Sequence, residues 1–358
     1  MNRRRLDVQA ASLFSGWMLA PAHLTAKPLG RLEHLSFKGN LKETRYGWLR
    51  LTPAYSVHLV GEILEAFHRR GDVVLDPFCG TGTTALVCAE RGVEADTTDI
   101  NPFLLWLART KTATYTPKHA QTFREQSAHI GRVIGRPGDP PWVPPLHQIE
   151  KWWTPATLDA LGRVMGAIRK AETSMPSDVV DLLKIAFCRV MIERANVSFG
   201  HQSMSFKKVD ATLSLPLTSA YQDELGLAWE RAAFSISGAS SSGILAAPSP
   251  ILCDARDLRT SLQCDRYGLV ITSPPYPNRM SYIRELRPYM YWLGYLDDGR
   301  QAGELDWKAI GGTWGCATSN VAKWKPERPI QVPYNGFAQI VANISATSPI
   351  LGPYVAKY

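Results

Sequence analysis

The feature that most constrains the fold is a short apolar run that ends in a turn containing two glycines. Val73–Asp76 has the character of a buried strand, and Pro77-Phe78-Cys79-Gly80-Thr81-Gly82 follows it directly, leading into a predicted helix over Thr84–Arg91. Glycine removes Cβ and permits positive φ, so a ligand can approach the backbone above the helix N-terminus. The pattern predicts a ligand-binding strand-turn-helix unit, although a tight corner without a ligand would have the same sequence.

Three further runs have strand character: Glu94–Asp99, Ile251–Asp254 and Tyr267–Thr272. Each ends in a polar or Gly/Pro-rich turn, which is typical of a doubly wound α/β sheet whose ligands bind at the carboxyl ends of the strands. The glycine turn lacks the lysine that follows the last glycine of a phosphate loop, so binding of a nucleoside triphosphate is disfavoured.

Acidic residues end two of these strands. Asp99 lies about 20 residues after the glycine turn, where a carboxylate can accept hydrogen bonds from the two hydroxyls of a ribose. It would otherwise cap the turn at Ile100-Asn101-Pro102. Asp254 can accept from an adenine amino group or act as the N-cap of a following helix. Together the acids favour a nucleoside cofactor.

The last predicted strand ends in Ser273-Pro274-Pro275-Tyr276. Successive prolines hold a rigid extended turn that presents carbonyl oxygens. The Ser273 hydroxyl and the Pro274 carbonyl can accept the hydrogens of an exocyclic amine of a base, which directs the nitrogen lone pair toward a methyl donor. The Tyr276 ring can stack on the same base. A target amine inside a duplex is inaccessible, so the base would have to be flipped out.

With these motifs the sequence resembles the N4-cytosine and N6-adenine DNA methyltransferase family. The cofactor motif is similar to Asp76–Thr84 and the catalytic motif to Ser273–Tyr276, while Trp48–Ser56 is similar to the stretch that packs against the methionine end of the cofactor. The resemblance implies a Rossmann-like class I methyltransferase sheet with S-adenosylmethionine as cofactor. It implies the catalytic residues Ser273, Pro274, Pro275 and Tyr276 and the cofactor-binding residues Asp76, Pro77, Phe78, Gly80, Gly82, Thr83, Asp99, Asp254 and Thr52.

Serine at the first catalytic position resembles the N4-cytosine subgroup, whereas the N6-adenine enzymes usually carry aspartate there. We therefore expect an enzyme that methylates N4 of cytosine in double-stranded DNA beside a cognate restriction endonuclease or another phage-defence nuclease. N6-adenine methylation and an inactive DNA- and cofactor-binding fragment stay open. C5-cytosine methylation is disfavoured, since it needs a cysteine nucleophile and Tyr276 follows the prolines here.

The motif order predicts four regions: a basic arm (1–45), the cofactor-binding half (46–115), an inserted helical region for target recognition (116–250) and the catalytic half (251–358). The net charge is +8, and an excess of Lys and Arg in the arm suits DNA but also suits a solvated tail. In the insert, Asp178–Ala195 has the apolar spacing of a buried helix. The predicted DNA contacts are His201, Lys207, Lys208, Arg279 and Arg284, although the stretch Ser198–Lys208 could equally be an ordinary polar loop.

After the catalytic motif we expect a loop and helix over residues 277–296, a polar connection over 297–335 and a helix within 336–358. The family's sheet has seven strands, so the last strands would be missing and the catalytic strand would be an open edge. This predicts a split or truncated enzyme with a complementing C-terminal half.

No run approaches the roughly 20 apolar residues that cross a bilayer, and no apolar stretch follows the N-terminal arginines. We therefore expect a cytoplasmic protein and no membrane partner. The six cysteines have neither partners nor spacing for a metal site, so we expect buried reduced thiols and no metal.

Overall fold

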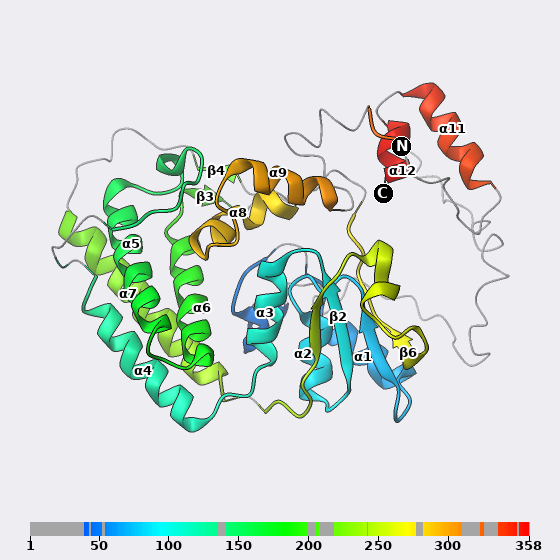
Figure 1. Cartoon of the computed structure of the whole chain (residues 1–358). Helices are drawn as coiled ribbons and strands as arrows, with labels where there is room; N and C mark the ends of the chain where they lie inside the picture. Colours follow the sequence, from blue (N-terminus) through cyan, green and yellow to red (C-terminus); the bar gives the residue numbers. More distant parts are fainter. Residues whose placement is uncertain are drawn as a thin grey trace, which may run out of the picture. The chain divides into compact units, whose positions relative to one another are not determined.

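Figure 1 shows the computed structural model of the chain, coloured along the sequence. The structure describes residues 39–42, 44–51, 54–134, 136, 141–198, 205–207, 218–241, 243–276, 282–309, 323–325, 336–348 and 351–357. Thr52, His201, Lys208 and Arg279, which the sequence predicts to bind cofactor or DNA, lie outside these ranges. Among the described residues, no helix combines the length and the apolar character that a bilayer crossing needs.

A parallel four-stranded sheet forms one part of the fold, as predicted. Its strands are β1 (Val73–Asp76), β2 (Ala95–Asp99), β5 (Ser249–Leu252) and β6 (Tyr267–Val270), in the order β5-β2-β1-β6. The first strand therefore has β2 on one side and β6 on the other. In such a sheet the connections diverge at β1, which opens a crevice at the carboxyl ends of the strands.

Helices flank this sheet (Figure 1). Residues of α1 (Val57–Phe67) and α2 (Thr83–Glu90) form one apolar cluster with β1 and Ile271, while α3 (Pro102–Thr112) contacts β2, β5 and α2. Two short 3-10 helices, Gly39–Lys42 and Arg45–Gly47, precede α1, and two more, η7 (Ala255–Thr260) and η8 (Cys264–Arg266), join β5 to β6.

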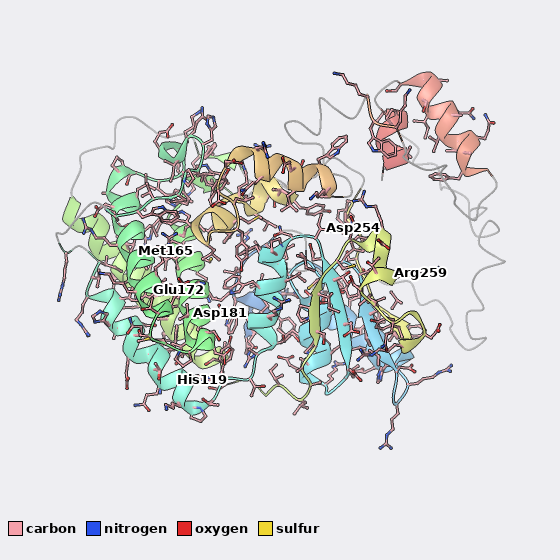
Figure 2. All side chains as sticks on the ribbon, viewed as in Figure 1. His119, Met165, Glu172, Asp181, Asp254 and Arg259 are labelled. Carbon is pink, nitrogen blue, oxygen red and sulfur yellow. The ribbon has the colours of Figure 1, made fainter. Side chains whose placement is uncertain are left out.

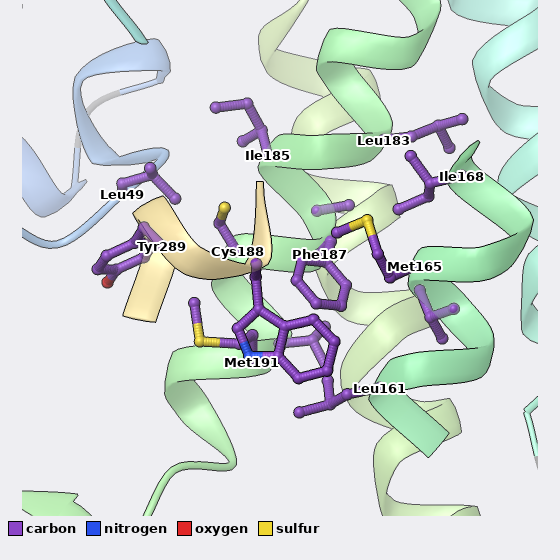
Figure 3. Close-up of a cluster of buried hydrophobic side chains, with 14 of the residues drawn as sticks. Leu49, Leu161, Met165, Ile168, Leu183, Ile185, Phe187, Cys188, Met191 and Tyr289 are labelled. Atoms are coloured by element: carbon purple, nitrogen blue, oxygen red, sulfur yellow. The ribbon is translucent and has the colours of Figure 1, made fainter. Parts of the chain in front are cut away.

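The inserted region is helical, and Asp178–Ala195 was correctly predicted as a buried helix. Its helices are α4 (Pro117–Gly131), α5 (Pro155–Glu172), α6 (Ser177–Glu193) and α7 (Thr218–Ala239), with a 3-10 turn at Ile149–Lys151 and the short antiparallel pair β3 (Val197–Ser198) and β4 (Ser205–Phe206). Figure 3 shows how Leu49 and Tyr289 pack onto α6, so that segments before and after the insert share its core.

Tyr289 belongs to α8 (Tyr282–Trp292), the helix that follows the motif Ser273–Tyr276. Trp292 on the same helix is fully buried against Phe187 of α6 and Trp153, with ring centroids 5.2 and 5.9 Å apart. The chain is therefore anchored twice after the insert, first in the sheet through β6 and then in the helical core through α8.

Several elements differ from the sequence prediction: β2 begins at Ala95 and β6 ends at Val270, each inside its predicted range. β5 begins at Ser249 and ends at Leu252, and its Pro250 is tolerated because β5 is an edge strand. The polar connection was wrong over Gly299–Lys308, which forms α9; Asp298 caps this helix by accepting from the Gln301 N–H at 2.8 Å. The C-terminal helix is divided into α11 (Phe337–Thr347) and α12 (Leu351–Lys357), since Ser348 is extended.

A fully buried arginine joins the two ends of the insert. The Arg45 guanidinium donates to the carbonyls of Lys111 (2.8 Å) and Ala113 (2.6 Å), where the chain leaves α3, and to those of Ala239 (3.3 Å) and Ser240 (2.8 Å), where it leaves α7. Removing the donor would leave these buried carbonyls without hydrogen bonds, which is costly.

We expect Arg45→Met to lower the free energy of unfolding by about 3 kcal/mol or more, because each orphaned carbonyl costs about 1–3 kcal/mol. Arg45→Lys keeps the charge but loses the planar fork of donors, and its loss should be intermediate. Urea denaturation of the full chain measures both variants. A loss below about 1 kcal/mol for Arg45→Met would show that the carbonyls find other donors.

Candidate active site

A cleft of about 340 Å³ lies at the carboxyl ends of the strands. Residues that follow each of the four strands line it, so motifs far apart in the sequence share one cavity. From the strand ends come Pro77, Phe78, Cys79, Gly80, Thr81, Asp99, Ile100, Asn101, Cys253, Asp254, Ala255, Ser273, Pro274, Pro275 and Tyr276. The remaining lining residues are Ala54, Tyr55, Leu104, Tyr282, Ile283, Lys308 and Ala309.

The glycine turn lies between β1 and α2. Gly80 and Gly82 have φ values of +51° and +75°, which glycine adopts without strain. A Cβ on Gly82 would lie 3.0 Å from the Cα and Cβ atoms of Ala108 on α3. Gly80 thus lines the cleft, whereas Gly82 allows α2 and α3 to pack closely behind it. The buried Lys111 stabilises the turn, since its Nζ donates to the Thr81 carbonyl at 2.9 Å.

Asp76 supports the cleft without lining it. Its side chain is fully buried, and Oδ1 accepts from the Phe78 N–H at 3.1 Å and from the Thr272 hydroxyl at 2.8 Å. The Tyr55 hydroxyl donates to Oδ2 at 3.3 Å. Burial raises the pKa of Asp76 to about 6, although these hydrogen bonds oppose the shift. Asp76 therefore links the glycine turn to the residue just before Ser273.

Asp99 is half-buried at the end of β2 and faces the cleft. Its Oδ2 accepts from the Gly80 N–H at 3.0 Å, and its Oδ1 accepts from the Asn101 N–H at 2.9 Å. Burial raises the pKa of Asp99 to about 6. The turn-capping role is therefore present, and the same carboxylate also fixes the glycine turn at the wall of the cleft.

Asp254 lies at the β5 end of the cleft (Figure 2). Its Oδ1 accepts from the Arg256 N–H at 3.0 Å, so it is the N-cap of η7, and the Arg256 side chain forms an ion pair with it. The hydrogen bonds from Arg256 hold the pKa of Asp254 below its usual value. Both interpretations made from the sequence remain compatible with this position.

The four residues Ser273–Tyr276 line the opposite end of the cleft, beyond β6. Ser273 is half-buried, and Tyr276 is 55% exposed. The Tyr276 N–H donates to the Tyr282 hydroxyl at 2.9 Å, which links the motif to the first residue of α8. An exposed ring on an anchored backbone is well suited to stacking on a ligand that enters from solvent.

Comparison with known proteins identifies the family of the segment that carries the glycine turn of this cleft. Residues 39–109 match a family model described as DNA methylase (N6_N4_Mtase). This segment belongs to the N4-cytosine and N6-adenine DNA methyltransferase family. It contains the glycine turn and Asp99, and it ends before the motif Ser273–Tyr276.

Several type II DNA methyltransferases match part of the chain. M.AvaI of a Nostoc strain is 32% identical over 69 residues, and M.BsoBI of Geobacillus stearothermophilus is 35% identical over 69 residues. Each alignment covers 19% of this chain and 14% of the relative. M.MjaII of Methanocaldococcus jannaschii is 35% identical over 65 residues, which are 17% of this chain and 12% of that protein. No solved structure matches significantly.

The predicted cofactor-binding and catalytic residues that the structure describes fall into two groups. Pro77, Phe78, Gly80, Asp99, Asp254 and the four residues Ser273–Tyr276 line the cleft, whereas Asp76, Gly82 and Thr83 lie behind it. Lys207 and Arg284 are exposed and do not line the cleft. Lys308 and Ala309 were missed, because α9 was not predicted.

Gly82→Ala tests the close packing of α2 on α3 behind the turn. Gly71 provides the matched control, because it has φ +93° but no atom within 4 Å of an added Cβ. We expect Gly82→Ala to be less stable than Gly71→Ala by about 1–3 kcal/mol, the cost of overpacking against Ala108. Urea denaturation measures the difference, and equal losses would mean that backbone strain alone requires glycine at position 82.

Proposed function

We propose that this chain is an S-adenosylmethionine-dependent DNA methyltransferase that methylates N4 of cytosine in duplex DNA. The observation that supports this most is the shared cleft. The glycine turn and Asp99 of the family-matched segment line the same cavity as Ser273–Tyr276. A volume of about 340 Å³ also lies within the range typical of small-molecule sites.

The strand order supports one direction for the proposed cofactor. Along the carboxyl edge of the sheet, Asp254 follows β5, Asp99 follows β2, the glycine turn follows β1 and Ser273 follows β6. In the proposal, Asp254 accepts from the adenine amine, Asp99 accepts from the ribose hydroxyls, and the methionine end lies near the turn. The sulfonium methyl then faces the motif Ser273–Tyr276.

In the proposal, the residues of the motif have different roles toward the target base. The Ser273 hydroxyl and the Pro274 carbonyl accept the two hydrogens of the cytosine amine, and Tyr276 stacks on the ring of the flipped base. These acceptors would orient the amine lone pair toward the methyl group that bound S-adenosylmethionine would supply. The new N–C bond would form as the S–CH₃ bond breaks, and the electron pair of the broken bond would stay on the sulfur of S-adenosylhomocysteine. The nitrogen then loses one proton through the hydrogen-bonded acceptor to water.

The substrate assignment depends on Ser273. A neutral hydroxyl next to the target amine is the N4-cytosine pattern of the family, and N6-adenine methylation is the competing enzyme function. DNA would be held by the basic arm of residues 1–45 and by Lys207, Lys208, His201, Arg279 and Arg284. Lys207 and Arg284 are exposed, which is compatible with such contacts.

The open edge of β6 favours a protein partner. In the described part of the chain, no strand pairs with the outer side of β6, and Val270 is 55% exposed. We propose that a complementing polypeptide, equivalent to the C-terminal half of a methyltransferase, adds strands here. Because the relatives are type II methyltransferases, a cognate restriction endonuclease is the proposed biological partner.

Ser273→Ala should lower kcat for methyl transfer to duplex DNA at least about 100-fold, because one acceptor for the developing ammonium is lost. The control is Ser261→Ala, on an exposed turn after η7. Transfer of labelled methyl, followed by nucleoside analysis, measures rate and product together. Label in N6-methyladenine would refute the cytosine assignment, and wild-type binding of cofactor without transfer would favour the inactive fragment.

The raised pKa of Asp99 predicts that cofactor binding depends on pH. The carboxylate must be ionised to accept from both ribose hydroxyls, and its pKa is about 6. Affinity for S-adenosylhomocysteine should therefore be constant above pH 7 and fall as the pH drops through about 6, by up to about tenfold per pH unit. Calorimetric titration from pH 5 to 8 measures this, and Asp99→Asn should bind weakly with a flatter profile. An unchanged profile in Asp99→Asn would assign the titration to another group.

A further inference from the structure

Arg256 connects the two sides of the β5 end of the cleft. Its Nε lies 2.9 Å from Oδ1 of Asp254, and its Nη2 lies 2.5 Å from Oδ2. The same Nη2 donates to the carbonyl of Lys308, the last residue of α9, at 3.2 Å. Arg256 does not line the cleft, whereas Asp254, Lys308 and Ala309 do. Any influence of Arg256 on a ligand must therefore pass through these neighbours.

The first neighbour is the Asp254 carboxylate. An ionised carboxylate offers about four acceptor positions. Arg256 fills three of them, two at Oδ1 through its N–H and Nε and one at Oδ2 through Nη2. Among the contacts of the described residues, the remaining position lies on Oδ2, and the fork of donors fixes the rotamer that presents it. The hydrogen bonds from Arg256 also lower the pKa of Asp254.

The second neighbour is the end of α9. The last carbonyls of a helix have no partner within the helix and carry partial negative charge, so a guanidinium is a favourable cap. α9 packs on α8, which is anchored in the helical core through Trp292. The bond from Arg256 to Lys308 therefore ties this helical layer to the β5 end of the sheet, across the cleft.

Fold stability does not explain this arrangement. The side chains of Arg256 and Asp254 are 51% and 34% exposed, and ion pairs this exposed contribute little to stability. Directed hydrogen bonding at the edge of a ligand cleft is the more specific role.

We propose that Arg256 is a positioning residue that sets selectivity for the exocyclic amine of the cofactor's adenine. It presents a single open acceptor of Asp254 to that amine and holds the end of α9 over the same part of the cleft. This inference rests on the proposed function, in which Asp254 contacts the adenine.

The test measures binding of two ligands to the full chain by calorimetry. S-adenosylhomocysteine carries the amine, and S-inosylhomocysteine carries a carbonyl oxygen in its place, which would face the carboxylate. The wild-type chain should prefer the first ligand about tenfold or more, as expected for a hydrogen bond to a charged acceptor. In Arg256→Gln the preference should shrink to within about threefold, chiefly through weaker binding of S-adenosylhomocysteine, and Arg256→Lys should restore part of it.

Arg259→Gln is the matched control. Arg259 lies on the same 3-10 segment and is exposed, and it does not line the cleft (Figure 2). This variant should keep the wild-type preference, and all variants should keep the wild-type denaturation midpoint.

Three outcomes would overturn the proposal. If Arg256→Gln binds S-adenosylhomocysteine more tightly, Arg256 competes with the adenine. If Asp254→Asn loses the preference while Arg256→Gln retains it, Asp254 acts alone and the proposed function survives. If the wild-type chain binds neither ligand, the proposed cofactor site fails and this inference fails with it.

Discussion

A buried carboxylate connects the glycine turn to the segment that carries the motif Ser273–Tyr276. Asp76 accepts from the Phe78 N–H in the glycine turn and from the hydroxyl of Thr272, which is 196 residues away in the sequence. The neighbouring residue Ser273 is placed by the same contact, so the geometry between the glycine turn and the motif Ser273–Tyr276 depends on Asp76. Burying this carboxylate raises its pKa to about 6, and the cost is limited because its oxygens are hydrogen-bonded.

Thr272 can contact Asp76 across this long sequence separation because the inserted helical region begins and ends at neighbouring positions in the fold. Arg45 donates to the Ala113 carbonyl where the chain leaves α3 and to the Ser240 carbonyl where it returns from α7, so both ends of the insert are held at one place. The insert is also joined to the catalytic side, because Trp292 of α8 packs in its core. The motif Ser273–Tyr276 therefore connects two rigid layers, β6 in the sheet and α8 in the helical core. Such a loop is held at both ends while its side chains face the cleft.

The sequence predicted the parts of this arrangement that depend on local patterns. β1 is a short apolar run and β2 contains two β-branched threonines, each strand ends in an aspartate, and the parallel sheet was confirmed. Helix α9 was not predicted, because its buried residues are Ala302, Gly303 and Asp306. Glycine and aspartate do not contribute to the apolar periodicity by which a helix is predicted. The contacts of Arg45 and Arg256 could not be predicted either. Both arginines donate to backbone carbonyls that are distant in the sequence. A sequence pattern does not show which carbonyl a side chain will reach.

The carboxylates and the cations around the cleft come from different elements of the fold. Asp99 and Asp254 line the cleft at the strand ends and Asp76 lies behind it; burial raises the pKa of Asp76 and Asp99, and the Asp254 charge is balanced by Arg256. The exposed cations Arg284 and Lys308 lie on α8 and α9 instead. Carboxylates attract a sulfonium cation and repel phosphate, whereas cations attract phosphate. In the proposed reaction this separation would favour the DNA phosphates near α8 and α9 and leave the uncharged flipped base to enter near the carboxylates.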